Sequence, residues 1–342
     1  MHLRESARHR RITRILEDRF ELWGYAPVET PLVDYVEVYR ELLPEPRLRD
    51  TYRVVDRQGE VLAVRSDTTL FLAKQLGLHL TTEELPVRVW YNDQIVRAEE
   101  EDEIAANEYQ QAGLELVGSN GIESDMEVLV ILQDTLQALD LGDAAIHLGS
   151  HRIIEEAART SSGGTSAGGN TDSADAEQLR SVVSRRRPIP EEFGVPRDVE
   201  ELLRFIGSPE AFRKLLSGLT LPGPVRHAGE ALLERALPLD HTPAIRIDTS
   251  ELGAHDYYTG IAFGVYHPGS TAAIARGGRY DELLGHFGFD APSVGFSMFT
   301  RKFPCATQEH PHESLPAAPG KTFTERLARA RESHNRGERM HL

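Results

Sequence analysis

The stretches His255-Asp-Tyr-Tyr-Thr-Gly260 and Ala275-Arg-Gly-Gly-Arg-Tyr-Asp281 decide the predicted fold. Apolar runs typical of strands lie around them, at residues 260–266, 272–275 and 293–298. The connections between these runs are short, and strands joined by short connections pair antiparallel. We therefore expect this part of the chain to supply several strands of an antiparallel sheet.

The first 140 residues show a similar pattern. Two strand-like runs, 51–56 and 60–65, flank a loop with Gly59 and predict a hairpin, and further strand patterns occupy 87–99 and 109–117. Helical periodicity and end signals predict helices over residues 6–23, 68–76 and 122–139. Because hairpins outnumber helical crossovers, the predicted fold class is α+β, an antiparallel sheet flanked by helices and interrupted by an insert.

The middle and the end of the chain differ in character. Residues 161–176, SSGGTSAGGNTDSADA, are small and polar and predict a flexible stretch. After residue 303 no strand pattern returns, and only a weak helical stretch near 322–331 interrupts a tail that we expect to be mobile. The expected domains are two core parts, 1–141 and 241–303, a small mainly helical insert, 142–240, and a poorly ordered tail, 304–342.

Composition excludes several function classes. The 342 residues carry 54 Asp and Glu against 38 Lys and Arg, a formal net charge of −16. Nucleic-acid binding draws on Lys and Arg, so tRNA is an unfavourable partner, and the triplet Arg185-Arg-Arg187 is interpreted as a solvated loop. The chain has no run of about 18 apolar residues, no secretory signal at its start and one cysteine, Cys305. These features predict a cytoplasmic protein without a membrane span.

Motifs for cofactors and metals are missing from the sequence. Gly320-Lys-Thr322 resembles the end of a phosphate-binding loop, but Leu315 stands where the first glycine is needed. No paired-cysteine or His-Glu-x-x-His spacing occurs, and His310 and His312 are interpreted as part of a solvated tail. We therefore expect neither a cofactor nor a metal.

The order and spacing of several short stretches give the strongest signal about function. Arg65–Thr69, Trp90–Glu99 and Tyr109–Glu115 precede the two opening stretches, and Val294-Gly-Phe-Ser297 follows them. Together they resemble the histidyl-tRNA synthetase family and, more closely, its paralogues, the regulatory subunits of ATP phosphoribosyltransferase. The resemblance covers about residues 9–303. It implies a class II aminoacyl-tRNA synthetase-like core with a six-stranded antiparallel sheet and a dimer interface near Pro31.

The same stretches predict a small polar pocket. Gln111 and Glu115 are four residues apart, so on a strand their side chains leave the same face. Acceptors, hydroxyl groups and aromatic rings together suit a compact ligand with an ammonium group and an imidazole. In the family this pocket holds histidine, and the resemblance implies these histidine-binding residues: Asp67, Thr69, Arg97, Gln111, Glu115, Tyr257 and Tyr258. The alternative is that these polar residues only pair across the sheet.

The resemblance also assigns a role to each of these residues except Tyr257. Asp67, Thr69 and Gln111 would meet the α-amino group and Arg97 the carboxylate. Glu115, with Tyr258, would meet the imidazole. Asp67 stands where the synthetases carry Glu, and Asp at this position is compatible with the regulatory paralogues.

The cations that activate an amino acid with ATP are largely missing. The transition state of this step needs preorganised positive charge. The family's reactive arginine falls at Gly253, and its last arginine falls at Lys302. Residues 99–103 are five consecutive acidic residues, which repel a triphosphate at short range. Arg97 and Arg279 remain, and we expect them to be insufficient for catalysis.

Three hypotheses for the function follow. The first is a non-catalytic regulatory subunit of ATP phosphoribosyltransferase. It forms a dimeric core that assembles with the short-form catalytic subunit into a hetero-oligomer, and it transmits feedback inhibition by L-histidine in histidine biosynthesis. The second is a divergent synthetase-like ligase that activates histidine or a related acid with ATP. The third is a stand-alone binding module for tRNA or another protein. The sequence favours the first.

Overall fold

The computed structural model describes residues 3–43, 48–98, 107–161, 171–239, 243–253, 257–300, 303, 318–320 and 322–336. The chain forms two compact units. One comprises Ala7–Pro304, and the other comprises Met1–Ser6 with Cys305–Leu342. The acidic connection after Arg97, the residues 254–256 and Lys302, all of which entered the sequence predictions, lie outside the described residues.

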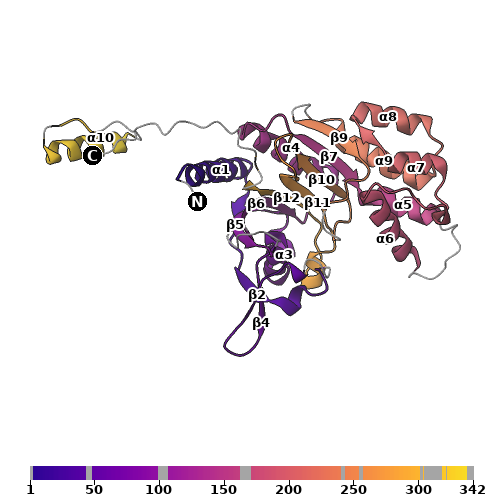
Figure 1. Ribbon diagram of the computed structural model, residues 1–342, viewed down its shortest axis with the longest axis horizontal. Helices are drawn as coiled ribbons and strands as arrows, with labels where there is room; N and C mark the ends of the chain where they lie inside the picture. Colours follow the sequence, from indigo (N-terminus) through magenta and orange to yellow (C-terminus); the bar gives the residue numbers. More distant parts are fainter. Residues whose placement is uncertain are drawn as a thin grey trace. The chain divides into compact units, whose positions relative to one another are not determined.

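A large sheet is the centre of the first unit (Figure 1). Within the described residues it has nine strands, in the order β1-β5-β6-β12-β11-β10-β7-β9-β8. Its pairs are antiparallel except β1 with β5 and β7 with β9, so the predicted mainly antiparallel sheet is confirmed, with more than six strands. The strands are β1 (Ala26–Pro27), β5 (Val87–Val96), β6 (Glu108–Val117), β7 (Ala145–Ser150), β8 (Ile206–Gly207), β9 (Ala244–Asp248), β10 (Ile261–Tyr266), β11 (Ala275–Arg279) and β12 (Ser293–Phe299).

The first part of the chain also forms a second sheet, which has three strands. It has the order β2-β4-β3, from β2 (Val33–Tyr35), β3 (Arg53–Val55) and β4 (Val61–Val64). The predicted hairpin is therefore confirmed as β3 and β4, which pair antiparallel. The small sheet leads directly into α3 (Thr68–His79), whose first turn supplies predicted site residues.

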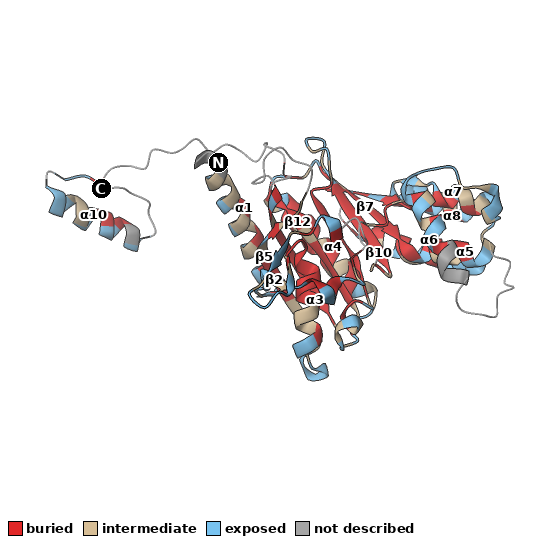
Figure 2. Cartoon of the chain, turned by 60° about the horizontal axis from the view of Figure 1, so that its bottom comes forward, coloured by how far each residue is buried: buried red, intermediate tan, exposed pale blue. Residues whose placement is uncertain are grey.

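Helices bury apolar faces against the large sheet. In α1 (Leu3–Leu22), Ile12, Leu16 and Phe20 recur at helical spacing and belong to the main hydrophobic core. The helix α4 (Ile122–Ala138) adds Val128 and Leu132 to the same core. Figure 2 shows the buried residues concentrated in the strands and on the helix sides that face them.

The range 142–240, predicted as an insert, supplies both a strand and helices. Its strand β7 pairs with β10 and β9 inside the large sheet. The helices that follow gather at the sheet end that holds β7, β9 and β8 (Figure 1). They are α5 (His151–Ser161), α6 (Thr171–Ser184), α7 (Arg197–Leu203), α8 (Pro209–Gly218) and α9 (Gly223–Ala236), and we refer to residues 151–237 as the helical region.

The second unit contains the last helix. The helix α10 spans Phe323–Asn335 and includes the weak helical stretch predicted near residues 322–331. Over the described residues, no helix combines the length and apolar character that a bilayer crossing requires.

Candidate functional site

The first turn of α3 lies against one face of β6. The carboxylate of Asp67 caps α3, because its Oδ1 accepts from the backbone N–H of Leu70 at 3.4 Å. The backbone N–H of Thr68 donates to Gln111 Oε1 at 2.9 Å, and Thr69 Oγ1 donates to Glu115 Oε1 at 3.0 Å. Gln111 and Glu115 therefore reach the same turn of α3 from the same face of β6. We call Asp67, Thr69, Gln111 and Glu115 the polar cluster.

Glu115 lies at the bottom of the polar cluster, where it is 2% exposed. The hydroxyl of Tyr280, the residue that follows β11, donates to Glu115 Oε2. It reaches past β12, where Gly295 stands directly opposite Glu115 and any side chain would overlap the carboxyl group. The pKa of Glu115 is raised to about 8, mainly by burial and also by the negative charge of Asp67, while the hydrogen bonds from Tyr280 and Thr69 oppose the shift. A nearby cation would favour the ionised carboxylate.

Gln111 brings an unsatisfied donor into the cluster. Its side chain is fully buried, and its Nε2 has no hydrogen-bond partner among the described residues. Its Oε1, which accepts from Thr68, keeps a second lone pair for another donor. A buried donor without a partner costs about 1–3 kcal/mol, so a ligand acceptor at this point would be stabilised.

Arg97 connects the cluster to the end of β5. Its Nη2 lies 3.4 Å from Asp67 Oδ2, and its Nε donates to the carbonyl of Ser66 at 2.8 Å. Its guanidinium also lies 5.1 Å from the centre of the Phe299 ring. The cation is thus held beside the N-terminal end of α3, where both the helix dipole and the charge favour an anionic group.

Tyrosine rings complete the site. The ring centre of Tyr257 lies 5.1 Å from that of Tyr258 and 5.4 Å from that of Tyr280. Tyr280 links this aromatic group to Glu115, and Tyr91 bonds Thr69 Oγ1 at 3.0 Å. All seven predicted site residues are therefore brought into one connected set. The sequence prediction omitted Tyr280 and Tyr91, although both lie inside the informative stretches.

The cluster differs from the predicted pocket in one respect. Its side chains contact one another directly, so it is a packed polar group rather than an open cavity. The contacts run mainly between the α3 turn and β6 rather than between neighbouring strands. A ligand would have to replace some of these contacts. One donor, Gln111 Nε2, would be available to it without the loss of an existing hydrogen bond.

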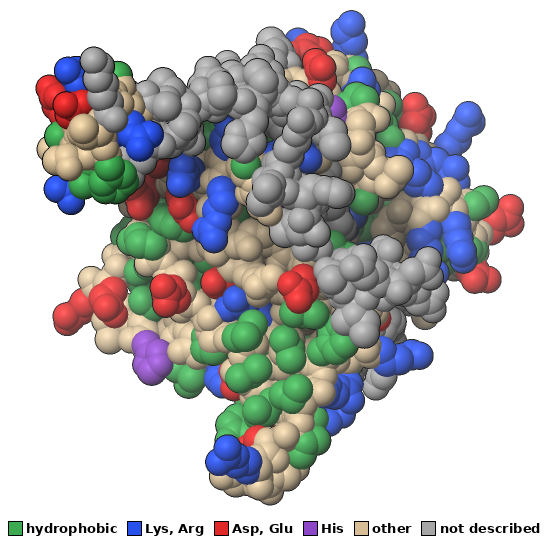
Figure 3. Space-filling view, turned by 60° about the vertical axis from the view of Figure 1, so that its left-hand side comes forward, with side chains coloured by type: hydrophobic (Ala, Val, Ile, Leu, Met, Phe, Trp, Pro, Cys, Tyr) green, Lys and Arg blue, Asp and Glu red, His purple; other side chains and the backbone are tan. Residues whose placement is uncertain are grey.

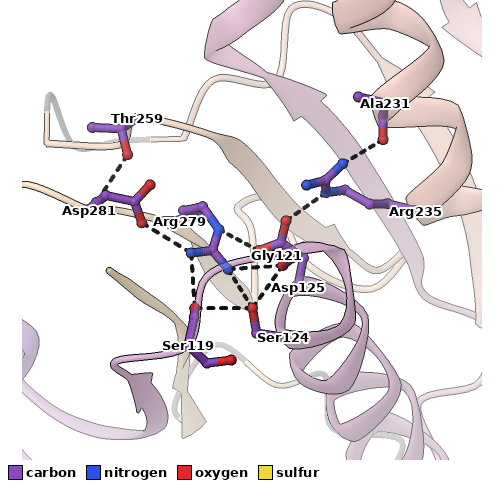
Figure 4. Close-up of polar contacts among 9 residues, drawn as sticks. All are labelled: Ser119, Gly121, Ser124, Asp125, Ala231, Arg235, Thr259, Arg279 and Asp281. Carbon is purple, nitrogen blue, oxygen red and sulfur yellow. Dashed lines mark hydrogen bonds and ion pairs between the residues drawn. The ribbon is translucent and has the colours of Figure 1, made fainter. Parts of the chain in front are cut away.

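The guanidinium of Arg279 is bound by acceptors within the protein (Figure 4). Its guanidinium is 6% exposed, and its Nε donates to Asp125 Oδ1 at 2.7 Å. Its two terminal nitrogens donate to four further acceptors: Ser119 O, Asp281 Oδ1, Gly121 O and Ser124 Oγ. A guanidinium has five N–H donors, so internal acceptors use them all. The buried Asp125 also binds Arg235 Nε at 2.6 Å, which connects α9 to α4 and β11.

Gly253, where the resemblance places a reactive arginine, leaves no room for a side chain. Gly253 has φ +70°, a backbone conformation that residues other than glycine rarely adopt. A Cβ at this position would also overlap the Tyr258 ring. An arginine here would therefore require both a different backbone and a displaced tyrosine.

Comparisons with known proteins agree with this architecture. The sequence model of the family described as Histidyl-tRNA synthetase matches residues 1–303. The ATP phosphoribosyltransferase regulatory subunit of Moorella thermoacetica is 29% identical, with 97% of this chain and 87% of that protein covered. The protein of the same name from Symbiobacterium thermophilum is 30% identical, with 92% and 79% covered.

Solved structures show the same fold. A protein titled ATP phosphoribosyltransferase regulatory subunit/histidyl-tRNA synthetase, from Bacillus halodurans, superposes with a TM-score of 0.79 at 23% identity, covering 98% of this chain and 88% of that one. Histidyl-tRNA synthetase from Nostoc superposes with a TM-score of 0.70 at 18% identity, covering 96% and 80%. The resemblance drawn from the motifs is thus confirmed, and the chain belongs to the histidyl-tRNA synthetase family, among the ATP phosphoribosyltransferase regulatory subunits.

Proposed function

We propose that this chain is a regulatory subunit of ATP phosphoribosyltransferase and that its polar cluster binds free L-histidine as a feedback signal. The observation that carries the proposal is the pair Gln111 and Glu115, buried on one face of β6, with an unsatisfied amide donor and a carboxyl group beside tyrosine rings. The relatives named ATP phosphoribosyltransferase regulatory subunit support the same role.

Histidine matches the chemistry of the cluster. Its α-amino group would be placed near Asp67 and Gln111 Oε1, and its carboxylate near Arg97. Its imidazole would reach Glu115, whose pKa of about 8 lets the carboxyl group either accept a proton from a cationic ring or donate to a neutral one. The surrounding tyrosines exclude water from these polar contacts, which strengthens each of them.

The same geometry supports a role without catalysis. Arg279, one of two retained cations, has no N–H left for a phosphate, and Gly253 replaces the reactive arginine. A ligase with this chain would exchange pyrophosphate into ATP in the presence of histidine. We expect no exchange at high protein concentration, and histidine-dependent exchange would establish the ligase alternative instead.

The partners belong to the same proposal. A subunit without chemistry needs a catalytic subunit, and we propose the short form, which lacks its own regulatory part. The outer face of the small sheet supports self-association, because Val33, Tyr35 and Val54 share this face and are 44%, 50% and 44% exposed. Figure 3 shows hydrophobic side chains gathered where this sheet projects. We place the resulting assembly in the cytoplasm.

Histidine binding tests the proposal directly. Titration calorimetry of the full chain with L-histidine should give saturable binding, and Glu115→Ala should weaken it by about tenfold or more, since a charge-assisted hydrogen bond is lost. Glu115→Gln, which keeps the volume, separates this effect from loss of folding. Unchanged affinity in both folded variants would remove Glu115 from the site and contradict the proposal.

A further inference from the structure

The helical region contains a cavity of about 190 Å³ that shares no residue with the polar cluster. Arg186 and Arg187 line it from the turn after α6, Arg204 from the end of α7, and Ser250 from the turn after β9. Buried apolar side chains of α6 and α7 form much of the remaining wall. Among the described residues that line this cavity, none carries a carboxylate.

Arg186 is held in place at the rim of the cavity. Its φ of +52° is a left-handed conformation, which glycine usually supplies after a helix. Its Nη2 donates to Asp248 Oδ2 at 2.7 Å. The same carboxyl group binds His147 Nδ1 at 3.0 Å and accepts from Ser250 Oγ at 2.6 Å. The guanidinium is therefore oriented before any ligand arrives.

The charged side chains that line the cavity are all positive. Asp248 pairs with Arg186, and Glu200 Oε1 accepts from Arg204 at 2.7 Å. Arg187 has no ion pair among the residues that the structure describes, so one of the three lining arginines has no carboxylate partner there. The whole chain carries −16, and a local excess of positive charge on such a protein concentrates anions at one place.

We propose that this arginine-lined cavity binds a compact phosphate-bearing anion. Guanidinium groups present planar pairs of N–H donors that match phosphate oxygens. The volume is below the ~300–1,000 Å³ of pockets for larger ligands, which favours inorganic pyrophosphate or the phosphate group of a small sugar phosphate. This inference does not rest on histidine binding or on the proposed regulatory role.

Calorimetry with the full chain tests the site in chloride buffer at low ionic strength. Pyrophosphate should bind saturably at one site, and Arg187→Gln or Arg204→Gln should weaken binding by about tenfold, as expected for loss of a charge-assisted hydrogen bond. The matched control is Arg185→Gln, because Arg185 belongs to the same triplet but does not line the cavity. This variant should change the affinity less than twofold.

A parallel titration with ribose 5-phosphate distinguishes the two sources of phosphate. Binding of both probes supports a site for the phosphate group of a larger molecule, and binding of pyrophosphate alone supports an inorganic anion. Absence of saturable binding with either probe overturns the proposal. Equal weakening by Arg185→Gln and Arg187→Gln also overturns it, since only diffuse surface charge would then attract the anion.

Discussion

At the scale of single residues, Glu115 couples stability to pH. Its folded-state pKa of about 8 lies above its ordinary value of 4.5, because burial penalises the charged form. The contribution of this group to folding is fully present below pH 4.5 and is lost as the pH rises toward 8. Relative to the unsubstituted chain, Glu115→Gln should therefore gain about 3 kcal/mol of unfolding free energy between pH 5.5 and pH 8.

Urea unfolding of both proteins at the two pH values measures this difference. The chain is compared without histidine, so that ligand binding does not contribute. A stability difference that stays constant with pH would show that Glu115 ionises normally in the folded state.

Neighbouring glutamines on β6 offer a matched pair of substitutions. Gln111 faces the α3 turn, whereas Gln110 faces the other way and donates to Asn92 Oδ1 at 2.6 Å. Gln111→Leu should weaken histidine binding by about tenfold, because it removes a buried donor and acceptor of the site. Gln110→Leu should leave the affinity within twofold. Calorimetric titration of both variants checks the prediction, and equal losses would argue that β6 was merely distorted.

At the scale of elements, two of the carboxylates on α4 have different functions. Asp125 is fully buried and joins β11 to α9 through Arg279 and Arg235, whereas Glu127 forms a more exposed pair with Arg88 at 2.7 Å. Asp125→Asn should cost about 3–5 kcal/mol of stability, because two arginines lose their buried counter-ion. Glu127→Gln should cost about 1 kcal/mol.

Denaturant midpoints and slopes of the two α4 variants provide the comparison. Asp125→Asn should cause the larger loss of stability, because it removes the ion pairs that join α4, α9 and β11. Similar losses in both variants would mean that the Arg235–Asp125–Arg279 network contributes no more than a surface pair.

Local patterns predicted most elements correctly. The hairpin β3–β4, the capped helix α3 and the long helix α4 follow from turn residues, caps and helical periodicity, which depend only on neighbouring residues. The strand predicted at residues 272–275 lies instead at Ala275–Arg279, because its glycines face close neighbours inside the sheet rather than forming a turn. Four strands were not predicted: β1, β2, β7 and β8. The strands β1, β2 and β8 are only two or three residues long, and β7 pairs only with distant segments.

The polar cluster could be predicted only in part from the sequence. Spacing on one strand was enough to place Gln111 and Glu115 on a common face. The spacing does not predict the contact with Tyr280, which reaches Glu115 across β12 only because Gly295 has no side chain. Arg279 was interpreted as a cation for ATP, since no local pattern reveals that Asp125, 154 residues away, binds it.

At the scale of the whole molecule, the small sheet predicts self-association. Val54 lies on its exposed apolar face, and a charge placed there would have to be desolvated in an interface between copies. Val54→Glu should weaken a dimer at least tenfold, as measured by sedimentation velocity over a dilution series. Leu78→Glu, on α3 and 56% exposed, is the control and should leave the assembly unchanged. A monomeric unsubstituted chain would contradict the proposed interface.

Regulation requires that histidine bind the inhibited assembly more tightly than the active one. The most direct measurement combines this chain with the short-form catalytic subunit of the same organism and follows formation of phosphoribosyl-ATP with and without L-histidine. We predict activity that depends on this chain and that histidine suppresses, with suppression lost in Glu115→Gln. Full activity without this chain, or activity that histidine leaves unchanged, would contradict the regulatory role.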